Sequence, residues 1–291
     1  MKRFLTILLI CLFLTGCTGS EPAEIAATTL PVYEFTSRLC AGTPLTVTRL
    51  VTEEVSCLHD YSLNVRQVKA AEAADLIVIS GAGLEEFMED LLHDAQTIDA
   101  SAGICLITPE EHHHHGEEES HDGHHHEEDP HIWLSPANAS VMAENICSGL
   151  SVQYPEYRPV FEENLKNLRT ELTALEDYGK QQLESLSCRD LITFHDGFSY
   201  FAHAFDLHIL RAVEEESGSE ASARELIALI EEVEHHSLPA IFTEKSGSVS
   251  AAGIIARETG CGSFPLDMAM AGDSYFDAMY HNIDMVKEAL G

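Results

Sequence analysis

A long segment near the middle of the chain decides the fold. From Pro155 to Ser187 it reads PEYRPVFEENLKNLRTELTALEDYGKQQLESLS. Apolar residues recur in it at spacings of mostly three or four, from Phe161 to Leu183, which is typical of one amphipathic helix. A helix of roughly 30 residues is about 45 Å long. This length predicts a rigid linker helix, residues 155–187, that runs along two lobes rather than a crossover within one sheet.

On either side of this segment, short β-rich apolar runs alternate with helical patterns, such as residues 65–74 and 84–94. A capping box, Ser222 to Glu225, begins another helix, and Gly260 follows a further one at 250–259. The alternation predicts an α/β fold of two Rossmann-like lobes, each a mostly parallel four-stranded sheet with helices on both faces. The predicted strands are residues 25–29, 45–51, 76–80 and 104–108 in an N-terminal lobe (25–154), and 191–194, 209–213, 240–243 and 263–266 in a C-terminal lobe (188–291).

The charge of the chain favours cations as ligands. Its 291 residues include 49 acidic and 16 basic side chains, a formal net charge of -33. Such a surplus of negative charge repels nucleic acid and anionic membrane surfaces. Nucleic-acid binding is therefore excluded as a function.

The first 16 residues have the pattern of a bacterial export signal. Lys2 and Arg3 precede an apolar run, residues 4–15, that is too short to span a bilayer permanently. The run ends in LTGC at Cys17, which resembles the lipobox in which the cysteine is acylated. We expect residues 1–16 to be removed and residues 17–24 to form a lipid-anchored tether. The protein is thus expected as a monomer at the outer face of the cytoplasmic membrane or facing the periplasm.

Eight cysteines become six when Cys11 leaves with the signal and Cys17 carries the lipid. No two of the six have the C-x-x-C spacing of a thiolate zinc site. An exported protein can oxidise some of them. Cys188 and Cys261 each come shortly before a predicted strand of the second lobe, and they are the disulfide pair that we expect.

Three histidines and one aspartate lie at or beyond the carboxyl ends of predicted strands: His59, His131, His195 and Asp267. Open α/β sheets bind ligands beyond the carboxyl ends of their strands. Two of the four residues come from each half, so a site between the lobes is predicted. Three imidazoles and one carboxylate suit tetrahedral Zn²⁺, whereas a second carboxylate in place of an imidazole favours Mn²⁺. The residues alone also allow ordinary hydrogen-bonded histidines, because their spacings match no local metal motif.

Several stretches resemble the solute-binding lipoproteins of zinc and manganese ABC importers, over nearly all of the chain after the signal. The most specific is DPHIWLSP at residues 129–136. The weaker ones are residues 75–85, Phe194-His195 with Tyr200-Phe201, residues 241–244 and the segment 275–290. The resemblance implies a non-enzymatic protein that captures Zn²⁺ between its lobes and delivers it to an ABC permease and its ATPase.

By this resemblance, His59, His131 and His195 match the three histidine ligands of the zinc members, and manganese members have a carboxylate where His195 stands. Asp267 matches the fourth ligand. The chain departs from the family there, because LDMAM at 266–270 replaces the usual proline and glycine after the aspartate. Water and Glu244 are the alternative fourth ligands. Otherwise we expect Glu244 to orient an imidazole through its other nitrogen.

A segment rich in histidine precedes His131 directly. Residues 110–129 contain eight histidines, nine acidic residues and no apolar side chain, which predicts a mobile loop. The zinc members of the family carry a similar loop, and we interpret this one as an auxiliary collector of zinc. A cloning tag and a merely solvated insert are the alternatives. The histidines are His112, His113, His114, His115, His121, His124, His125 and His126.

Other functions fit parts of this pattern. A manganese- or iron-binding protein of the same class would use a similar site with another metal preference. A secreted zinc hydrolase would need an open coordination position and a general base, and the chain has no H-E-x-x-H helix. A surface adhesin would use the acidic face and bind its partner whether or not metal is present.

Overall fold

The computed structural model describes residues 24–53, 55, 58, 61–108, 128–213, 222–245 and 250–291. The predicted signal, the lipid site Cys17, His59 and the eight histidines of the 110–129 segment lie outside these residues. Among the residues described, no helix is both long and apolar enough to span a bilayer.

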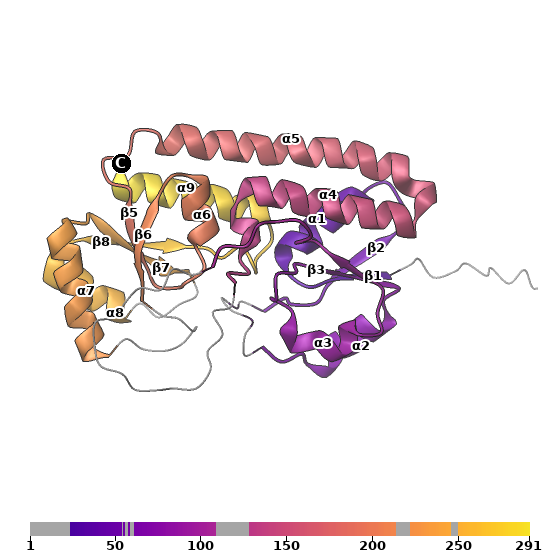
Figure 1. Ribbon diagram of the computed structural model, residues 1–291, viewed down its shortest axis with the longest axis horizontal. Helices are drawn as coiled ribbons and strands as arrows, with labels where there is room; N and C mark the ends of the chain where they lie inside the picture. The colour runs from indigo at the N-terminus through magenta and orange to yellow at the C-terminus, as the bar shows by residue number, and fades with distance from the viewer. Residues whose placement is uncertain are drawn as a thin grey trace, which may run out of the picture.

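The first lobe is a parallel four-stranded sheet with helices on both faces (Figure 1). Its elements are β1 (Glu24–Ala27), α1 (Leu30–Cys40), β2 (Thr46–Arg49), α2 (Val65–Ala73), β3 (Leu76–Ile79), the 3-10 turn η1 (Glu86–Met88), α3 (Glu89–Leu92) and β4 (Thr97–Asp99). The strand order is β2-β1-β3-β4. Side chains of β1 alternate between two cores: Ile25 and Ala27 pack toward α1, and Ala26 packs with Ala71 of α2. Both faces are therefore buried, as a parallel sheet requires.

The fourth strand of this sheet is not where the sequence predicts it. It is β4, held to β3 by the backbone bonds from Ile77 N to Gln96 O and from Ala100 N to Ile79 O. The apolar run at 104–108 is not a strand, and its Ile107 N donates instead to the hydroxyl of Tyr200 at 2.9 Å. The prediction of a strand at 104–108 is therefore wrong. The run is apolar because it packs against the second lobe, not because it belongs to the sheet.

The second lobe repeats this topology with strand order β6-β5-β7-β8. Its elements are β5 (Asp190–Thr193), α6 (Ser199–Ala204), β6 (His208–Ala212), α7 (Ala223–His236), β7 (Ala240–Glu244), α8 (Ser250–Thr259), β8 (Gly262–Leu266) and α9 (Tyr275–Leu290). Leu191 of β5 faces the core that includes α6 and α9, and Ile192 faces the core under α7 and α8. The predicted capping box is present, because Ser222 and Glu225 each accept the other's backbone N–H. The predicted two-lobe α/β fold is confirmed.

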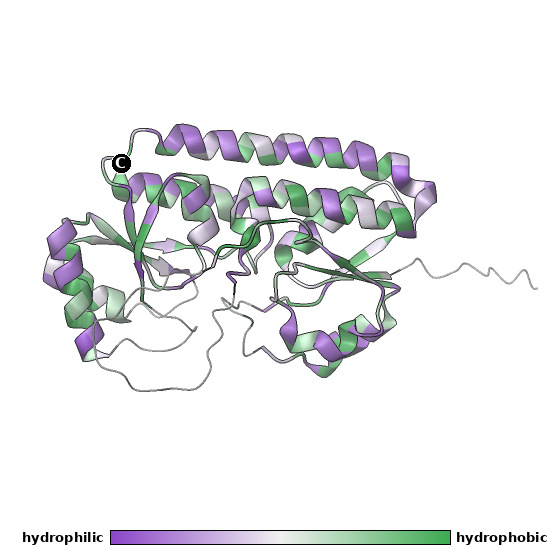
Figure 2. Ribbon diagram, viewed as in Figure 1, coloured by the Kyte–Doolittle hydropathy of each residue, from purple (hydrophilic) through white to green (hydrophobic). Residues whose placement is uncertain are grey.

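The long helix of the central segment is α5 (Arg158–Leu183), preceded by the 3-10 turn η3 (Pro155–Tyr157). It runs above both lobes and lies beside α4 (Pro136–Gln153) and α9 (Figure 1). Its 26 residues extend about 39 Å at 1.5 Å per residue. Hydrophilic and hydrophobic residues alternate along it (Figure 2). The buried side chains of α5 join one continuous core with residues of both sheets, so the helix ties the two lobes together.

The predicted disulfide is absent. Cys188 and Cys261 are both free, as are Cys40, Cys105 and Cys147. Cys188 precedes β5 and Cys261 precedes β8, but β7 lies between these two strands. Strands two positions apart in a sheet are separated by about 9.6 Å, which exceeds the Cα separation that a disulfide spans. The prediction failed because the sequence shows that each cysteine precedes a strand but does not show the order of those strands in the sheet.

Hydrogen bonds between buried groups also join the lobes. Trp133 Nε1 donates to Met268 O at 2.8 Å, and the hydroxyl of Tyr275 donates to Trp133 O at 2.8 Å. Leu30 N, at the start of α1, donates to Met270 O. These bonds attach the 267–272 segment of the second lobe to the first lobe at the level of the predicted metal site.

Candidate metal-binding site

The carboxyl ends of β5 and β7 carry the first pair of predicted site residues. The chain leaves β5 toward β6 on one side and returns to β7 on the other, so ligands are expected between β5 and β7. His195 lies two residues beyond β5, and Glu244 is the last residue of β7. Both side chains are buried, and His195 Nδ1 lies 3.1 Å from Glu244 Oε1. Nδ1 is therefore the nitrogen of His195 that lies beside the Glu244 carboxylate, and the orienting role of Glu244 stays a prediction.

The imidazole of His195 is held closely on its other sides. Thr193 Oγ1 donates to the backbone carbonyl of His195 at 3.0 Å. A Cβ atom at Gly197 would lie 2.6 Å from His195 Cδ2, so only glycine leaves room for the ring there. The backbone and the neighbouring residues thus fix the direction in which Nε2 points.

His131 comes from the segment between the first sheet and α4, directly before the 3-10 turn η2 (Ile132–Leu134). Asp129 Oδ1 accepts the backbone N–H of His131 at 2.9 Å and lies 2.8 Å from its Nδ1. The hydroxyl of Tyr200 donates to Asp129 O at 3.0 Å and so anchors this turn to the second lobe. Asp129 is a candidate orienting residue that the sequence analysis missed. Its signal is a carboxylate two residues before a histidine, within the DPH sequence.

The two histidines face each other across the lobes. Their Nε2 atoms are 3.5 Å apart, and the ring planes are nearly perpendicular, at 85°. A carboxylate at each Nδ1 favours the tautomer with the proton on Nδ1, which leaves a lone pair on each Nε2. Two such lone pairs repel each other unless a cation lies between them. Two nitrogens at about 2.0–2.1 Å from a tetrahedral zinc lie about 3.4 Å apart, so the observed spacing fits two ligands of one ion.

Asp267, the predicted fourth ligand, directly follows β8. Its Oδ1 accepts the N–H of Ala269 at 2.8 Å, and its Oδ2 accepts from Lys245 Nζ at 2.9 Å. Asp267 and Glu244 line the same small cleft of about 20 Å³, to which Val55 of the first lobe also contributes. A space of this size holds about one water molecule or ion. The aspartate thus shares a cleft with Glu244, and its carboxylate accepts a hydrogen bond from the ammonium group of Lys245.

The remaining predicted ligands lie outside the described residues. His59 is one of them, although Leu58 just before it is buried in the core of the first lobe. Within the described ranges, no group of three or more His, Cys, Asp or Glu side chains forms a metal site. The two facing imidazoles are thus the described part of the candidate site, and the ligand set as a whole stays a prediction.

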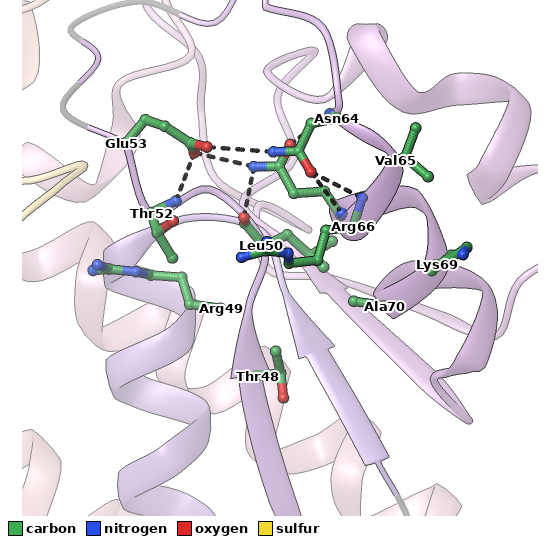
Figure 3. A pocket seen from close by; sticks show the side chains of 11 residues that line it. Thr48, Arg49, Leu50, Thr52, Glu53, Asn64, Val65, Arg66, Lys69 and Ala70 are labelled. Carbon is green, nitrogen blue, oxygen red and sulfur yellow. Dashed lines mark hydrogen bonds between the residues drawn. The ribbon is translucent and has the colours of Figure 1, made fainter.

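Another depression of the described surface lies on the first lobe, with a volume of about 880 Å³ (Figure 3). It lies between the end of β2 and the start of α2, where Asn64 caps the helix by accepting the N–H groups of Arg66 and Gln67. Three cations, Arg49, Arg66 and Lys69, line it. These three positive charges, against the single carboxylate of Glu53, disfavour a metal ion in this depression.

Several known proteins named for metal binding are similar to this chain in sequence. The zinc-binding lipoprotein AdcA of Streptococcus pneumoniae is 30% identical over 99% of this chain, which spans only 61% of that protein. The zinc uptake protein ZnuA of Bacillus subtilis is 28% identical, over 93% of this chain and 88% of its own length. Proteins of Streptococcus mitis and Yersinia pestis named for manganese transport and iron binding are 24% and 26% identical, each over 80% of this chain and over 78% and 73% of their own lengths.

Solved structures have the same fold. A crystal structure of ZnuA matches with a TM-score of 0.79 and 27% identity, and the match covers 93% of this chain and all of that one. The zinc-bound ZnuA-like domain of AdcA from Streptococcus pneumoniae matches with a TM-score of 0.77 and 25% identity, over 92% of this chain and 99% of that one. A family model matches residues 25–289, and the chain therefore belongs to the family described as zinc-uptake complex component A periplasmic, ZnuA.

Proposed function

We propose that this protein captures Zn²⁺ outside the cytoplasm, between its two lobes, and delivers it to an ABC permease and its ATPase for high-affinity zinc uptake. The observation that carries this proposal is the pair of buried imidazoles, His131 and His195, whose Nε2 atoms face each other at 3.5 Å. The similarity to relatives named for zinc binding and zinc uptake supports the choice of metal.

The proposed ligands are His59, His131, His195 and Asp267. Asp129 orients the imidazole of His131 and Glu244 that of His195, each through Nδ1, which also raises the basicity of the imidazole. Water or Glu244 itself is the alternative to Asp267 in the fourth position. Several imidazole ligands favour zinc over manganese. Manganese or iron binding is the second candidate function, because relatives named for those metals also match.

We further infer a non-catalytic role. A hydrolytic zinc site needs a general base near an open coordination position. Glu244 is the candidate for such a base. Its carboxylate lies against Nδ1 of His195, where it orients a ligand and does not face an open coordination position.

The site has to lie near the membrane to deliver its ion. We propose that Cys17 carries a lipid which anchors the protein, as a monomer, to the outer face of the cytoplasmic membrane. The segment 110–129 would serve as an auxiliary zinc collector next to the tight site, because its eight histidines offer several weak ligand sets. We expect the permease to dock on the face of the protein at which the site opens.

Metal content and competition test the proposal directly. Mature protein with and without residues 111–127 is compared with His195→Ala. The matched control is His208→Ala, an exposed histidine of β6 whose side chain is 66% accessible. We expect one tightly held zinc per chain that excess Mn²⁺ does not displace. Loss of a ligand should weaken it by about 100-fold or more, since even loss of an orienting partner costs about 10- to 100-fold. His208→Ala should bind as the wild type does.

The segment and the tight site can then be separated. Deleting residues 111–127 should lower the number of weakly bound zinc ions and slow uptake at low zinc, while the tight ion remains. A manganese preference that is indifferent to His195 would contradict the proposed function. Unchanged zinc stoichiometry and unchanged uptake after the deletion would contradict only the collector.

A further inference from the structure

Lys245 lies beside the proposed ligand Asp267 because of the register of two strands. β7 and β8 are parallel neighbours in which Glu244 is paired with Leu266. Lys245 directly follows β7, and Asp267 directly follows β8. The N–H of Lys245 extends the hydrogen bonding between the two strands by donating to Leu266 O at 2.8 Å. The side chains then meet, with Nζ donating to Oδ2 at 2.9 Å. This ion pair is thus a product of the sheet rather than a chance surface contact.

The two partners of this ion pair differ in how firmly they are held. The backbone N–H of Asp267 donates to Asn282 Oδ1 at 2.7 Å, and its carboxylate also accepts the N–H of Ala269. Its side chain is only 16% accessible, whereas that of Lys245 is 61% accessible. A lysine stem is long and flexible and its ammonium is strongly hydrated. The ammonium group can therefore leave, while the carboxylate stays in place.

A divalent cation and this ammonium group would compete for the same carboxylate. We propose that Lys245 is an internal cation that occupies Asp267 when zinc is absent and moves into solvent when zinc is captured. This inference rests on the proposed function of the site. Breaking the ion pair opposes zinc binding, and its re-formation assists zinc release. Lys245 is thereby a determinant of affinity and of the dissociation rate, acting through Asp267.

Removing the ammonium tests this role. Lys245→Met keeps a similar stem without the charge, and Lys245→Arg keeps a cation. The matched control is Lys166→Met, which removes the same charge from an exposed ion pair of 2.9 Å with Glu163 on α5. Zinc dissociation constants are measured by competition with a chelator, and dissociation rates by transfer of zinc to excess chelator. The mature protein is used, and metal-free unfolding curves verify that each variant is folded.

We expect Lys245→Met to bind zinc about two- to fivefold more tightly, with most of the change in slower dissociation. Lys245→Arg and Lys166→Met should stay within twofold of the wild type. In an Asp267→Asn background, Lys245→Met should have no effect, because the interaction that it removes is already absent.

The outcomes separate this inference from the function on which it rests. Absence of tight zinc from the wild type would overturn both. Tight zinc in the wild type, with affinity and dissociation rate unchanged in Lys245→Met, would overturn this inference alone. An equal gain in Lys166→Met, or a gain that persists with Asp267→Asn, would reduce the effect to general charge and would also overturn it.

Discussion

The two lobes share one strand order but differ at the ends of their central strands. The two central strands are β1 and β3 in the first lobe and β5 and β7 in the second. In each lobe the residue that follows β1 or β5 donates its N–H to a carbonyl of the other central strand. Thr28 N donates to Val78 O at 3.0 Å in the first lobe, and Phe194 N donates to Phe242 O at 2.9 Å in the second. Counting onward from these bonds makes Thr29 equivalent to His195 and Ser80 equivalent to Glu244.

These equivalent pairs have different chemistry. In the first lobe the hydroxyls of Thr29 and Ser80 bond to each other at 2.9 Å, and both residues are fully buried. In the second lobe the imidazole of His195 contacts the carboxylate of Glu244 and keeps its Nε2 directed toward His131. The hydroxyl pair satisfies itself, whereas the imidazole–carboxylate pair leaves one nitrogen lone pair to be satisfied by a ligand.

The first lobe also contains a buried carboxylate, that of Glu85, and its hydrogen bonds hold the backbone at the strand ends. Glu85 accepts from the hydroxyl of Thr28 at 2.6 Å and from the N–H groups of Ser80 and Gly81 at 2.7 and 3.0 Å. Burial raises the pKa of Glu85, and these three hydrogen bonds lower it by less, so that the pKa is about 7. The same strand order therefore carries a closed polar network in one lobe and the candidate ligand site in the other, and the difference lies in the side chains at the strand ends.

The largest effect that follows from this comparison is on stability, through Glu85. Its pKa is about 7 in the folded protein against an ordinary value of 4.5, so the folded state binds this proton more strongly than the unfolded state. Stability is therefore lost as pH rises from 4.5 through 7, by about 3 kcal/mol. Glu85→Gln carries no titrating group and should lack this loss. Denaturant unfolding of the metal-free protein across this pH range measures it.

Glu86→Gln is the matched control for that measurement, because Glu86 is the next residue and is exposed. It should keep the pH dependence of the wild type. If Glu85→Gln and the wild type lose stability in parallel, the carboxyl group of Glu85 is already ionised at low pH, and the closed network is charged rather than neutral.

The next effect is on zinc binding, and it separates the two buried carboxylates. Glu244→Gln should weaken zinc binding about 10- to 100-fold, because a neutral amide next to Nδ1 makes the imidazole of His195 a poorer ligand. Glu85→Gln should leave the zinc dissociation constant within twofold. Chelator competition on both variants at one pH provides the measurement. Equal losses in the two variants would show that the first lobe also positions ligands, and the contrast between the lobes would disappear.

The sequence predicts the main features of the fold because they are carried by long periodic patterns. The apolar stripe from Phe161 to Leu183 identifies the linking helix, and β-rich runs identify seven of the eight strands. β4 has only three residues, with Ile98 as its one buried side chain, so its pattern is too short to recognise. The helical pattern at 84–94 becomes the 3-10 turn η1 followed by the single-turn α3, and the side chain of Glu85 there bonds to the backbone of the preceding turn.

The candidate site is predictable where residues follow strands and hidden where it depends on pairing between strands. His195 and Glu244 can be placed at the sheet edge from the strand pattern, and the structure brings them together. The ion pair of Lys245 with Asp267 depends on the register of β7 with β8, which no local pattern specifies. Asp129 lies only two residues before the histidine that it contacts. A carboxylate at this spacing from a histidine is common in sequences, so the contact cannot be predicted without the structure.

The smallest effect tests the equivalent positions themselves. Ser80→Ala is the first-lobe counterpart of Glu244→Gln, since it removes one partner of the hydroxyl pair at the same point of the sheet. A buried hydrogen bond between neutral groups contributes about 1 kcal/mol, so the free energy of unfolding should fall by about that amount. The zinc dissociation constant should stay unchanged. Unfolding curves and chelator competition on the same preparation measure both, with the exposed Ser185→Ala as control. A loss of zinc affinity in Ser80→Ala without a loss of stability would mean that this hydroxyl pair acts on the ligands, and that both lobes use their central strand ends for binding.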